Sequence, residues 1–530
     1  MSPSCAGCGH NEQDHLHLSF EAAELSASRM DELLKSNVPP LPVEHVQLEG
    51  AISKGLGYLA RLQERIGQAR ASLEMLLDEE RHVNRTMESY RTILHPIRRV
   101  PEDILREIFL SFNVETEKQG KDSLDRSFAP LIISQVCREW RSIALSTSRL
   151  WSSFRLDFDL YHNELPCQYL LQTYFLRSAT HDITLAIDST REISDSHLMP
   201  VILLSAPRWI SLSVIIPHDS LHAFSAARGS LHRLHRLYVE FIDEDFPELP
   251  DGLEKPVFDA FEYAPLLRSV RTEGVPEITK QINLPWSQIT DYVGQDGTTC
   301  YIDVLRLALA LERISLECYE GDDVDEIVPA SSHQRLRDLR VHESGAIPDP
   351  DTAPGGGIIY FLSHVEFPAL EFLKMVYDHP YIRVPTSLRG STARNLQALS
   401  ISASFPISVE VQADLVDLLK TTASLSRFSL ICRSALDQND GVFLALNVNA
   451  NPGIVPRLNS LTFRFMNTQP HMSPAFVDMV QSRRQAASTR SVLEELILLV
   501  RDVIPPVDLE VAARWKDLCD EGFVKYPMLQ

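Results

Sequence analysis

A short apolar pattern that recurs between residues 209 and 498 constrains the fold of this chain more than any other feature. Apolar residues occupy the first, fourth and sixth positions of each copy, as in Leu396, Leu399 and Ile401. Alternation at the end of each copy predicts a short strand with one buried face, and repetition of one unit predicts a repeat architecture. The clear copies are Trp209/Leu212/Val214, Leu234/Leu237/Val239, Leu311/Ile314/Leu316, Leu336/Leu339/Val341, Leu370/Leu373/Met375, Leu396/Leu399/Ile401, Leu425/Phe428/Leu430, Leu458/Leu461/Phe463 and Leu493/Leu496/Leu498, and weaker copies are Leu267/Val270/Thr272 and Trp286/Ile289/Asp291.

The spacing of the copies predicts one strand and one returning segment per unit. Ten steps separate Leu212 from Leu496, which gives about 28 residues per unit. Helical patterns lie between copies at residues 196–206, 301–310, 358–364, 411–420 and 474–484. One such unit cannot bury its own apolar face, whereas parallel stacking of units buries a continuous core. We therefore expect an α/β solenoid over residues 159–530, forming one curved parallel array, with an ordinary α/β domain as the alternative.

The repeated unit resembles a divergent leucine-rich repeat. The asparagine that usually follows the strand in that family is missing from most copies, so the resemblance implies an irregular array. Polar insertions at residues 243–255, 320–332 and 347–357 interrupt it. The second insertion is acidic but lacks the spacing of a calcium loop, so we interpret it as a solvated loop.

A heptad pattern precedes the repeats. From Ile52 to Leu94, apolar or small residues recur at alternating steps of three and four, with Gly55 and Glu80 as the weak positions. This spacing is typical of a coiled coil or a long helical arm. We expect a continuous helical arm over residues 48–95. Self-association and packing on the same chain both remain open, and we expect packing within the monomer.

Residues 1–47 are expected to form a weakly ordered tail. One short helix at residues 20–35 and a proline-rich linker at residues 39–42 are predicted there. Cys5, Cys8 and His10 have ligand types that zinc accepts, but no second cysteine pair follows them. We interpret them as part of the tail and expect no metal and no cofactor.

Two amphipathic helical segments lie between the arm and the repeats. In the first, Pro101 suits the first turn of a helix, and apolar residues share one face. A polar stretch at residues 113–130 is predicted to be a loop. A second helix is predicted at residues 131–145, followed by Leu150, Trp151 and a strand at residues 154–158. The apolar face of the first segment comprises Ile104, Leu105, Ile108, Phe109 and Phe112, and that of the second comprises Ile133, Val136, Cys137, Trp140, Ile143 and Ala144.

Residues 97–151 resemble the F-box family. The family pattern joins a proline-acidic-apolar helix to a Val-Cys-x-x-Trp-x-x-x-Ala helix and a Leu-Trp pair. Two features depart from it: Val100 stands where leucine usually precedes the proline, and the spacer is longer than in the compact form. The resemblance implies a three-helix F-box over residues 96–158 that docks on the Skp adaptor. The residues expected to contact the adaptor are Val100, Pro101, Ile104, Leu105, Ile108, Phe109, Val136, Cys137, Trp140, Leu150 and Trp151.

Composition and charge limit the partners of the chain. The 530 residues carry a net charge of −22, which disfavours nucleic acids and anionic membranes as general partners. The polar start has no signal-peptide pattern, and scattered cysteines are typical of reduced core thiols, so we expect a cytoplasmic or nuclear protein. Cys137 is expected to be buried. Cys167 follows Pro166 at a helix start, a position that could lower its pKa.

The resemblance implies a function without catalysis. F-box proteins with repeats serve as substrate receptors of SCF-type ubiquitin ligases, in which the Skp adaptor links the receptor to cullin and RING subunits. The repeats would bind an unknown target protein and bring it close to the conjugating enzyme. No common catalytic motif is recognisable, so we expect no enzyme and no cysteine that carries ubiquitin. Two alternatives stay open: a coiled-coil and repeat scaffold outside ubiquitination, and an enzyme built on an irregular α/β domain.

Overall fold

The computed structural model divides the chain into two compact units, Met1–Pro101 and Glu102–Gln530. No helix among the described residues is long and apolar enough to cross a membrane. The structure describes residues 25–242, 257–275, 277–295, 298–319, 331–344, 359, 362, 365–380, 382–386, 388, 392–433, 436–465, 473–485, 492–499 and 508–526.

The first unit is built around one long helix. α1 (Ala27–Lys35) precedes α2 (Pro42–Ile93), which has 52 residues, and η2 (Pro96–Arg99) follows. Pro42 opens α2 and does not belong to a linker, because proline fits the first helical turn, where its missing N–H is not needed. Arg29 of α1 pairs with Glu44 at the start of α2 at 3.0 Å. No residue of α2 is buried within the described chain.

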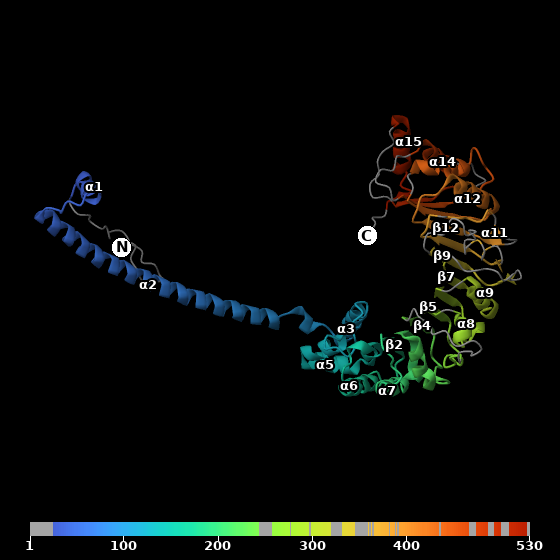
Figure 1. The fold of residues 1–530 in the computed structure, drawn as a ribbon, viewed down its shortest axis with the longest axis horizontal. Coiled ribbons are helices and arrows are strands. Elements are labelled where there is room, and N and C mark those ends of the chain that lie inside the picture. Colours follow the sequence, from blue (N-terminus) through green and yellow to red (C-terminus); the bar gives the residue numbers. More distant parts are fainter. Residues whose placement is uncertain are drawn as a thin grey trace. The chain divides into compact units, whose positions relative to one another are not determined.

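The second unit begins with helices and continues as one parallel sheet (Figure 1). Its helical elements are α3 (Glu102–Glu117), α4 (Ala129–Val136), α5 (Arg138–Ser146), η3 (Ser148–Trp151), η4 (Phe158–Leu160), α6 (Glu164–Arg177), α7 (Met199–Leu203), η5 (Ala206–Arg208), η6 (His218–Ala227), α8 (Ile278–Gln281), η7 (Trp286–Gln288), α9 (Thr298–Leu307), α11 (Thr392–Asn395), α12 (Val409–Thr421), η8 (Leu436–Asn439), α13 (Asp440–Leu446), α14 (Pro474–Arg484) and α15 (Leu509–Asp520).

The main sheet has 14 strands, and each pairs in parallel with the next one in sequence. These strands are β1 (Ser153–Asp157), β2 (Ile183–Asp188), β3 (Trp209–Ile216), β4 (Arg236–Phe241), β5 (Ser269–Glu273), β6 (Asp291–Gln295), β7 (Arg313–Tyr319), β9 (Asp338–Ser344), β11 (Phe372–Tyr377), β12 (Ala398–Ala403), β13 (Arg427–Cys432), β14 (Ser460–Phe465), β15 (Glu495–Leu499) and β16 (Val524–Lys525). β8 (Ser331–Ser332) and β10 (Val365–Glu366) pair separately. The expected α/β class and the parallel strand arrangement are confirmed.

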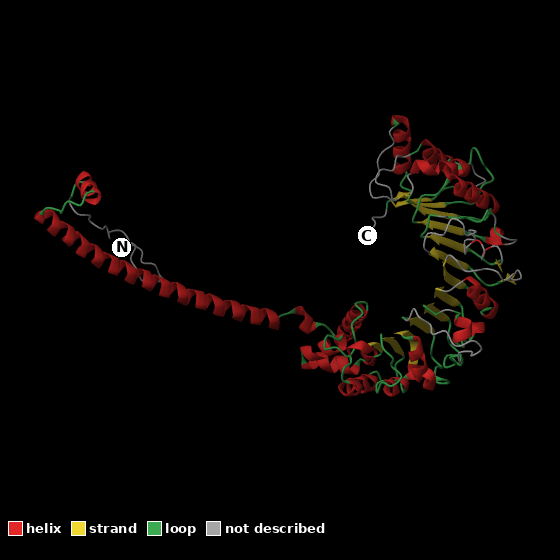
Figure 2. Ribbon diagram, in the orientation of Figure 1, coloured by secondary structure: helices red, strands yellow, loops and turns green. Residues whose placement is uncertain are grey.

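The central apolar residues of the repeated pattern form one row across the sheet. Leu212 pairs with Leu237, and the row continues strand by strand to Leu461 and Leu496, with its side chains buried. Figure 2 shows the helices from α6 onward on the convex side of the curved sheet, while α3 to α5 lie at its β1 end. The row therefore faces the helices and makes one continuous core.

Two features of the strand pattern differ from the expectation. The weak copy at Trp286, Ile289 and Asp291 is in the wrong register, because Trp286 lies in the turn η7 and the residue that joins the buried row is Tyr292. β2 and β16 were not predicted, since neither presents the full apolar pattern. The helix expected at residues 358–364 lies almost wholly outside the described residues.

His333 ties two neighbouring repeats together. It is only 3% exposed, and the backbone N–H of Leu336 donates to its Nδ1 at 3.2 Å. Its Nε2 lies 3.0 Å from the carbonyl oxygen of Ala308, so the neutral ring with a proton on Nε2 satisfies both contacts. Burial lowers the pKa of His333 below its ordinary value of 6.5.

This depressed pKa predicts acid sensitivity. As the pH falls, His333 is protonated in the unfolded chain before it is protonated in the folded chain. The contribution of His333 to the free energy of unfolding is therefore present above pH 6.5 and is lost as the pH falls through the pKa of the folded state. The loss reaches at most about 1.4 kcal/mol per pH unit inside this window. Urea unfolding between pH 7.5 and pH 5 should show a smaller acid loss for His333→Gln than for the natural chain. Equal pH slopes for the two proteins would contradict the assignment.

Candidate functional site

The residues expected to bind an adaptor lie just before α3 and along α3, α4, α5 and η3, and they fall into a buried group and an exposed group. Val100 and Pro101 close the first unit, with Val100 half-buried and Pro101 exposed. On α3, Leu105 and Phe109 are buried, and the ring of Trp140 from α5 lies 4.8 Å from that of Phe109. These contacts hold α3 and α5 together.

The Leu-Trp pair anchors the helices to the first repeat. Leu150 and Trp151 are fully buried, and the Trp151 Nε1–H donates to the carbonyl oxygen of Ala144 at 2.8 Å. The ring of Trp151 lies 5.2 Å from that of Tyr174 and 4.5 Å from the guanidinium of Arg177, both on α6. Leu150 and Trp151 are therefore structural residues and do not lie on a docking surface.

A second group of predicted residues is exposed. Ile104 and Ile108 on α3 are 49% and 44% exposed, and Val136 at the end of α4 is 56% exposed. Ile104 and Ile108 are four residues apart and share one face of α3, which Phe112, 42% exposed, extends by another turn. This apolar strip on α3 (Ile104, Ile108 and Phe112) is the candidate docking surface.

Cys137 is exposed, so the expectation that it is a buried packing group is wrong. The predicted second helix is broken there into α4 and α5, because Cys137 adopts an extended backbone with φ −157°. Its sulfur accepts the backbone N–H of Trp140 at 3.4 Å and caps α5. Cys137 therefore marks the end of α4 and the start of α5.

This capping role predicts the effect of replacing the thiol. Cys137→Ser should preserve or raise stability, because serine is a stronger N-cap, whereas Cys137→Ala should lose less than about 1 kcal/mol, because sulfur is a weak acceptor. Thermal unfolding of the two variants and the natural chain checks both outcomes. A loss of stability in Cys137→Ser as large as that in Cys137→Ala would contradict the capping role.

Three further cysteines, Cys167, Cys432 and Cys519, are less accessible than Cys137. Cys432 is buried, while Cys167 and Cys519 are partly buried. Burial raises the pKa of the Cys167 thiol, so the expectation of a lowered pKa at this helix start is wrong. No group of three potential metal ligands occurs among the described residues, and Cys5, Cys8 and His10 lie outside them.

The polar spacer covers the free edge of β1. Residues 113–117 continue α3, and the loop after them runs beside the strand. Ser123 N–H donates to the carbonyl oxygen of Arg155 at 2.8 Å, and Arg155 N–H donates to Ser123 Oγ at 2.9 Å. The carboxylate of Asp122 accepts the N–H of Asp157 at 2.8 Å and the hydroxyl of Tyr161, and burial raises its pKa. This covering prevents edge-to-edge association and joins the helices to the sheet.

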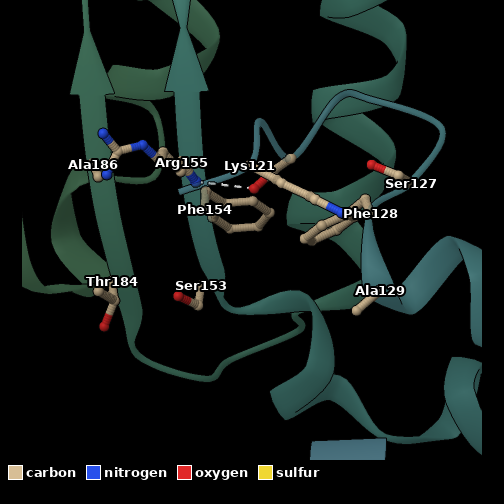
Figure 3. Close-up of a pocket in the computed structure, with 10 residues that line it drawn as sticks. Lys121, Ser127, Phe128, Ala129, Ser153, Phe154, Arg155, Thr184 and Ala186 are labelled. Atoms are coloured by element: carbon tan, nitrogen blue, oxygen red, sulfur yellow. Dashed lines mark hydrogen bonds between the residues drawn. The ribbon is translucent and has the colours of Figure 1, made fainter. Parts of the chain in front are cut away.

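A small cavity of about 120 Å³ lies between this loop and the first two strands. Figure 3 shows Lys121, Phe128 and Phe154, which line the cavity together with Arg155 of the same strand as Phe154. Among the described residues that line it there is no carboxylate, cysteine or histidine. The cavity therefore lacks an acid–base pair or an activated nucleophile of its own.

The open face of the sheet carries two kinds of surface. In the first strands, arginines pair with neighbouring carboxylates, as in Arg155–Asp188 at 2.6 Å and Arg271–Glu273 at 3.2 Å. No residue of β11, β12, β13 or β14 is acidic. The open face of these four strands presents the polar side chains Lys374, Ser400, Ser402, Arg427, Ser429, Ser460, Thr462 and Arg464. This basic face stands out in a chain with a net charge of −22.

Comparison with known proteins does not assign the chain to a family. No protein-family model matches the sequence, and no curated protein matches it. The features of the described residues that bear on function are therefore the exposed apolar strip of α3, the anchoring of the helices by Trp151 and the open face of the sheet.

Proposed function

We propose that this chain is the substrate-recognition subunit of an SCF-type ubiquitin ligase. Its three-helix F-box-like segment would bind the Skp adaptor, and its leucine-rich-repeat-like solenoid would bind the target. The observation that supports this proposal most is that α3 has two apolar faces. Leu105 and Phe109 are buried and hold the fold, while Ile104 and Ile108 are exposed. Apolar side chains lined up on a helix face are typical of a protein-binding surface.

Adaptor binding by the full-length chain tests this proposal. Ile108→Lys should weaken binding at least about 100-fold, because it places a charge in an apolar interface. Leu165→Lys is the matched control, since Leu165 lies on α6 and is 68% exposed. Isothermal calorimetry gives the affinities, and thermal unfolding should be unchanged in both variants. Absence of adaptor binding by the natural chain would contradict the proposal.

The packing of the helices decides which residue and which length of chain the binding test should use. Leu105 is 2% exposed, so its substitution would disturb the fold as well as binding. A fragment of residues 96–158 would omit Tyr174 and Arg177, which pack on Trp151. The full chain is therefore the appropriate reagent.

The open face of the sheet is our proposed target surface. Backbone groups of the strands are already paired, so recognition there would use side chains. The basic face of β11–β14 favours a target segment that presents carboxylates, because its positive side chains attract carboxylates and these four strands carry no acidic residue that would repel them.

Lys374→Glu with Arg464→Glu should remove such targets from affinity purifications without changing adaptor binding. Retention of every target would place recognition elsewhere.

A further inference from the structure

We propose that α2 pairs with α2 of a second copy of this chain as an antiparallel two-stranded coiled coil. The pairing would use the α2 seam, which is the set of residues at alternating steps of three and four along this helix. The seam consists of Ile52, Gly55, Leu59, Leu62, Ile66, Ala69, Leu73, Leu76, Glu80, Val83, Met87 and Tyr90.

The seam needs a partner of its own kind. Its large members other than the half-buried Leu62 are exposed within the described chain, as in Ile52 at 62%, Leu73 at 57% and Tyr90 at 56%. A 52-residue helix is about 78 Å long at 1.5 Å per residue, and a strict heptad seam requires an equally long helix beside it. The next longest helix in the described part of the chain is α3, with 16 residues. A second copy supplies the matching helix.

The two weak seam positions favour the antiparallel orientation. In a parallel pair in register, each seam residue faces its own copy, which would bury Glu80 against Glu80 and leave a gap where Gly55 meets Gly55. In the antiparallel pair that places Ile66 opposite Leu76 of the second copy, the same layers place Gly55 opposite Met87 and Glu80 opposite Leu62. Met87 then fills the gap left by Gly55, and the carboxylates of the two Glu80 residues lie in different layers.

Charges beside the seam favour the same orientation. Residues that flank the seam meet across a coiled coil and select its partner and direction. The antiparallel alignment brings Arg65 beside Glu79 of the second copy and Glu49 beside Arg91 of the second copy, and twofold symmetry repeats both pairs. The parallel alignment brings Arg65 beside Arg70 of the second copy, also twice. The antiparallel pair retains one unfavourable contact, between the two copies of Arg70 at its centre.

This proposal replaces the expectation that the arm packs within the monomer. It is independent of adaptor binding, because it uses only α2 in the first unit. A dimer would present two copies of the second unit to targets and raise the effective concentration of the second binding event.

Sedimentation of the full-length chain tests the seam. Leu76→Lys should raise the dimer dissociation constant at least about 100-fold, because two lysines enter the apolar seam of each dimer. Met75→Lys is the matched control: Met75 is 67% exposed and Leu76 63%, but Met75 lies outside the seam. The control should dimerise like the natural chain. A monomer at all concentrations, or equal effects of the two substitutions, would overturn the proposal.

A charge reversal tests the orientation. Arg65→Glu should weaken the antiparallel dimer about tenfold, because it replaces two attractions with two repulsions. The same change would strengthen a parallel dimer, where position 65 lies beside Arg70. Adding Glu79→Arg should restore the affinity of the antiparallel dimer. Tighter association of the single variant, or no rescue by the second change, would overturn the antiparallel alignment.

Discussion

Trp151→Ala is expected to cost about 3–5 kcal/mol of stability and to release the helices α3, α4 and α5 from the sheet. Trp151 is fully buried, and it contacts Tyr174 and Arg177 on α6. Alanine would leave a cavity between the helical segment and the first repeat. It would also remove the donor that satisfies the Ala144 carbonyl oxygen.

Hydrogen exchange measured along the chain separates this effect from general unfolding. Protection should fall in α3 to α6 and persist in β11 to β15, because a repeat array transmits disturbance mainly to neighbouring units. Tyr169→Ala is the control, since Tyr169 also lies on α6 but is 75% exposed. Unchanged protection of α3 in Trp151→Ala would show that other contacts hold the helices.

Arg483→Met should destabilise the C-terminal repeats by a similar amount, about 3–5 kcal/mol. Arg483 is 2% exposed and donates to the carbonyl oxygens of Leu446 at 2.9 Å, Ile454 at 3.2 Å and Val455 at 3.3 Å. Burial lowers the pKa of its guanidinium to about 10, so the group stays charged at neutral pH. Methionine fills part of the space but leaves three buried acceptors without a donor, and each costs about 1–3 kcal/mol.

Arg457→Met provides the comparison. Arg457 is exposed, and its substitution should change stability by no more than about 0.5 kcal/mol. Urea unfolding followed by exchange protection in α13 and α14 distinguishes the two variants. Equal stability of both proteins would show that water or a rearranged side chain satisfies the carbonyl groups.

The repeated apolar pattern predicted the sheet because it corresponds to a physical row. Residues such as Leu212 and Leu237 occupy the same position in neighbouring parallel strands and face the same core. The pattern failed at Trp286, where an aromatic residue in a turn resembled the first residue of a copy. It also missed β16, whose two residues are too few to show a period.

The sequence predicted which residues belong to the candidate site, but it did not predict which of them are buried and which are exposed. Leu105 and Ile108 are both apolar residues of α3, and only tertiary packing buries the first and exposes the second. Cys137 marks a break between two helices, and the apolar spacing across it resembles that of one continuous helix. The polar spacer gave no sign that Asp122 and Ser123 cover β1, because hydrogen bonding to a strand 32 to 35 residues away has no local pattern.

The most direct measurement of the proposed function is cullin recruitment by the immobilised full-length chain. We expect the cullin and RING subunits to be retained when the Skp adaptor is present and to be lost when it is omitted. Ile108→Lys should abolish retention of the adaptor and the cullin together, whereas Leu165→Lys should retain both. Retention of the adaptor without the cullin would identify a scaffold outside ubiquitination, and failure to retain the adaptor would contradict the assignment to an SCF-type ligase.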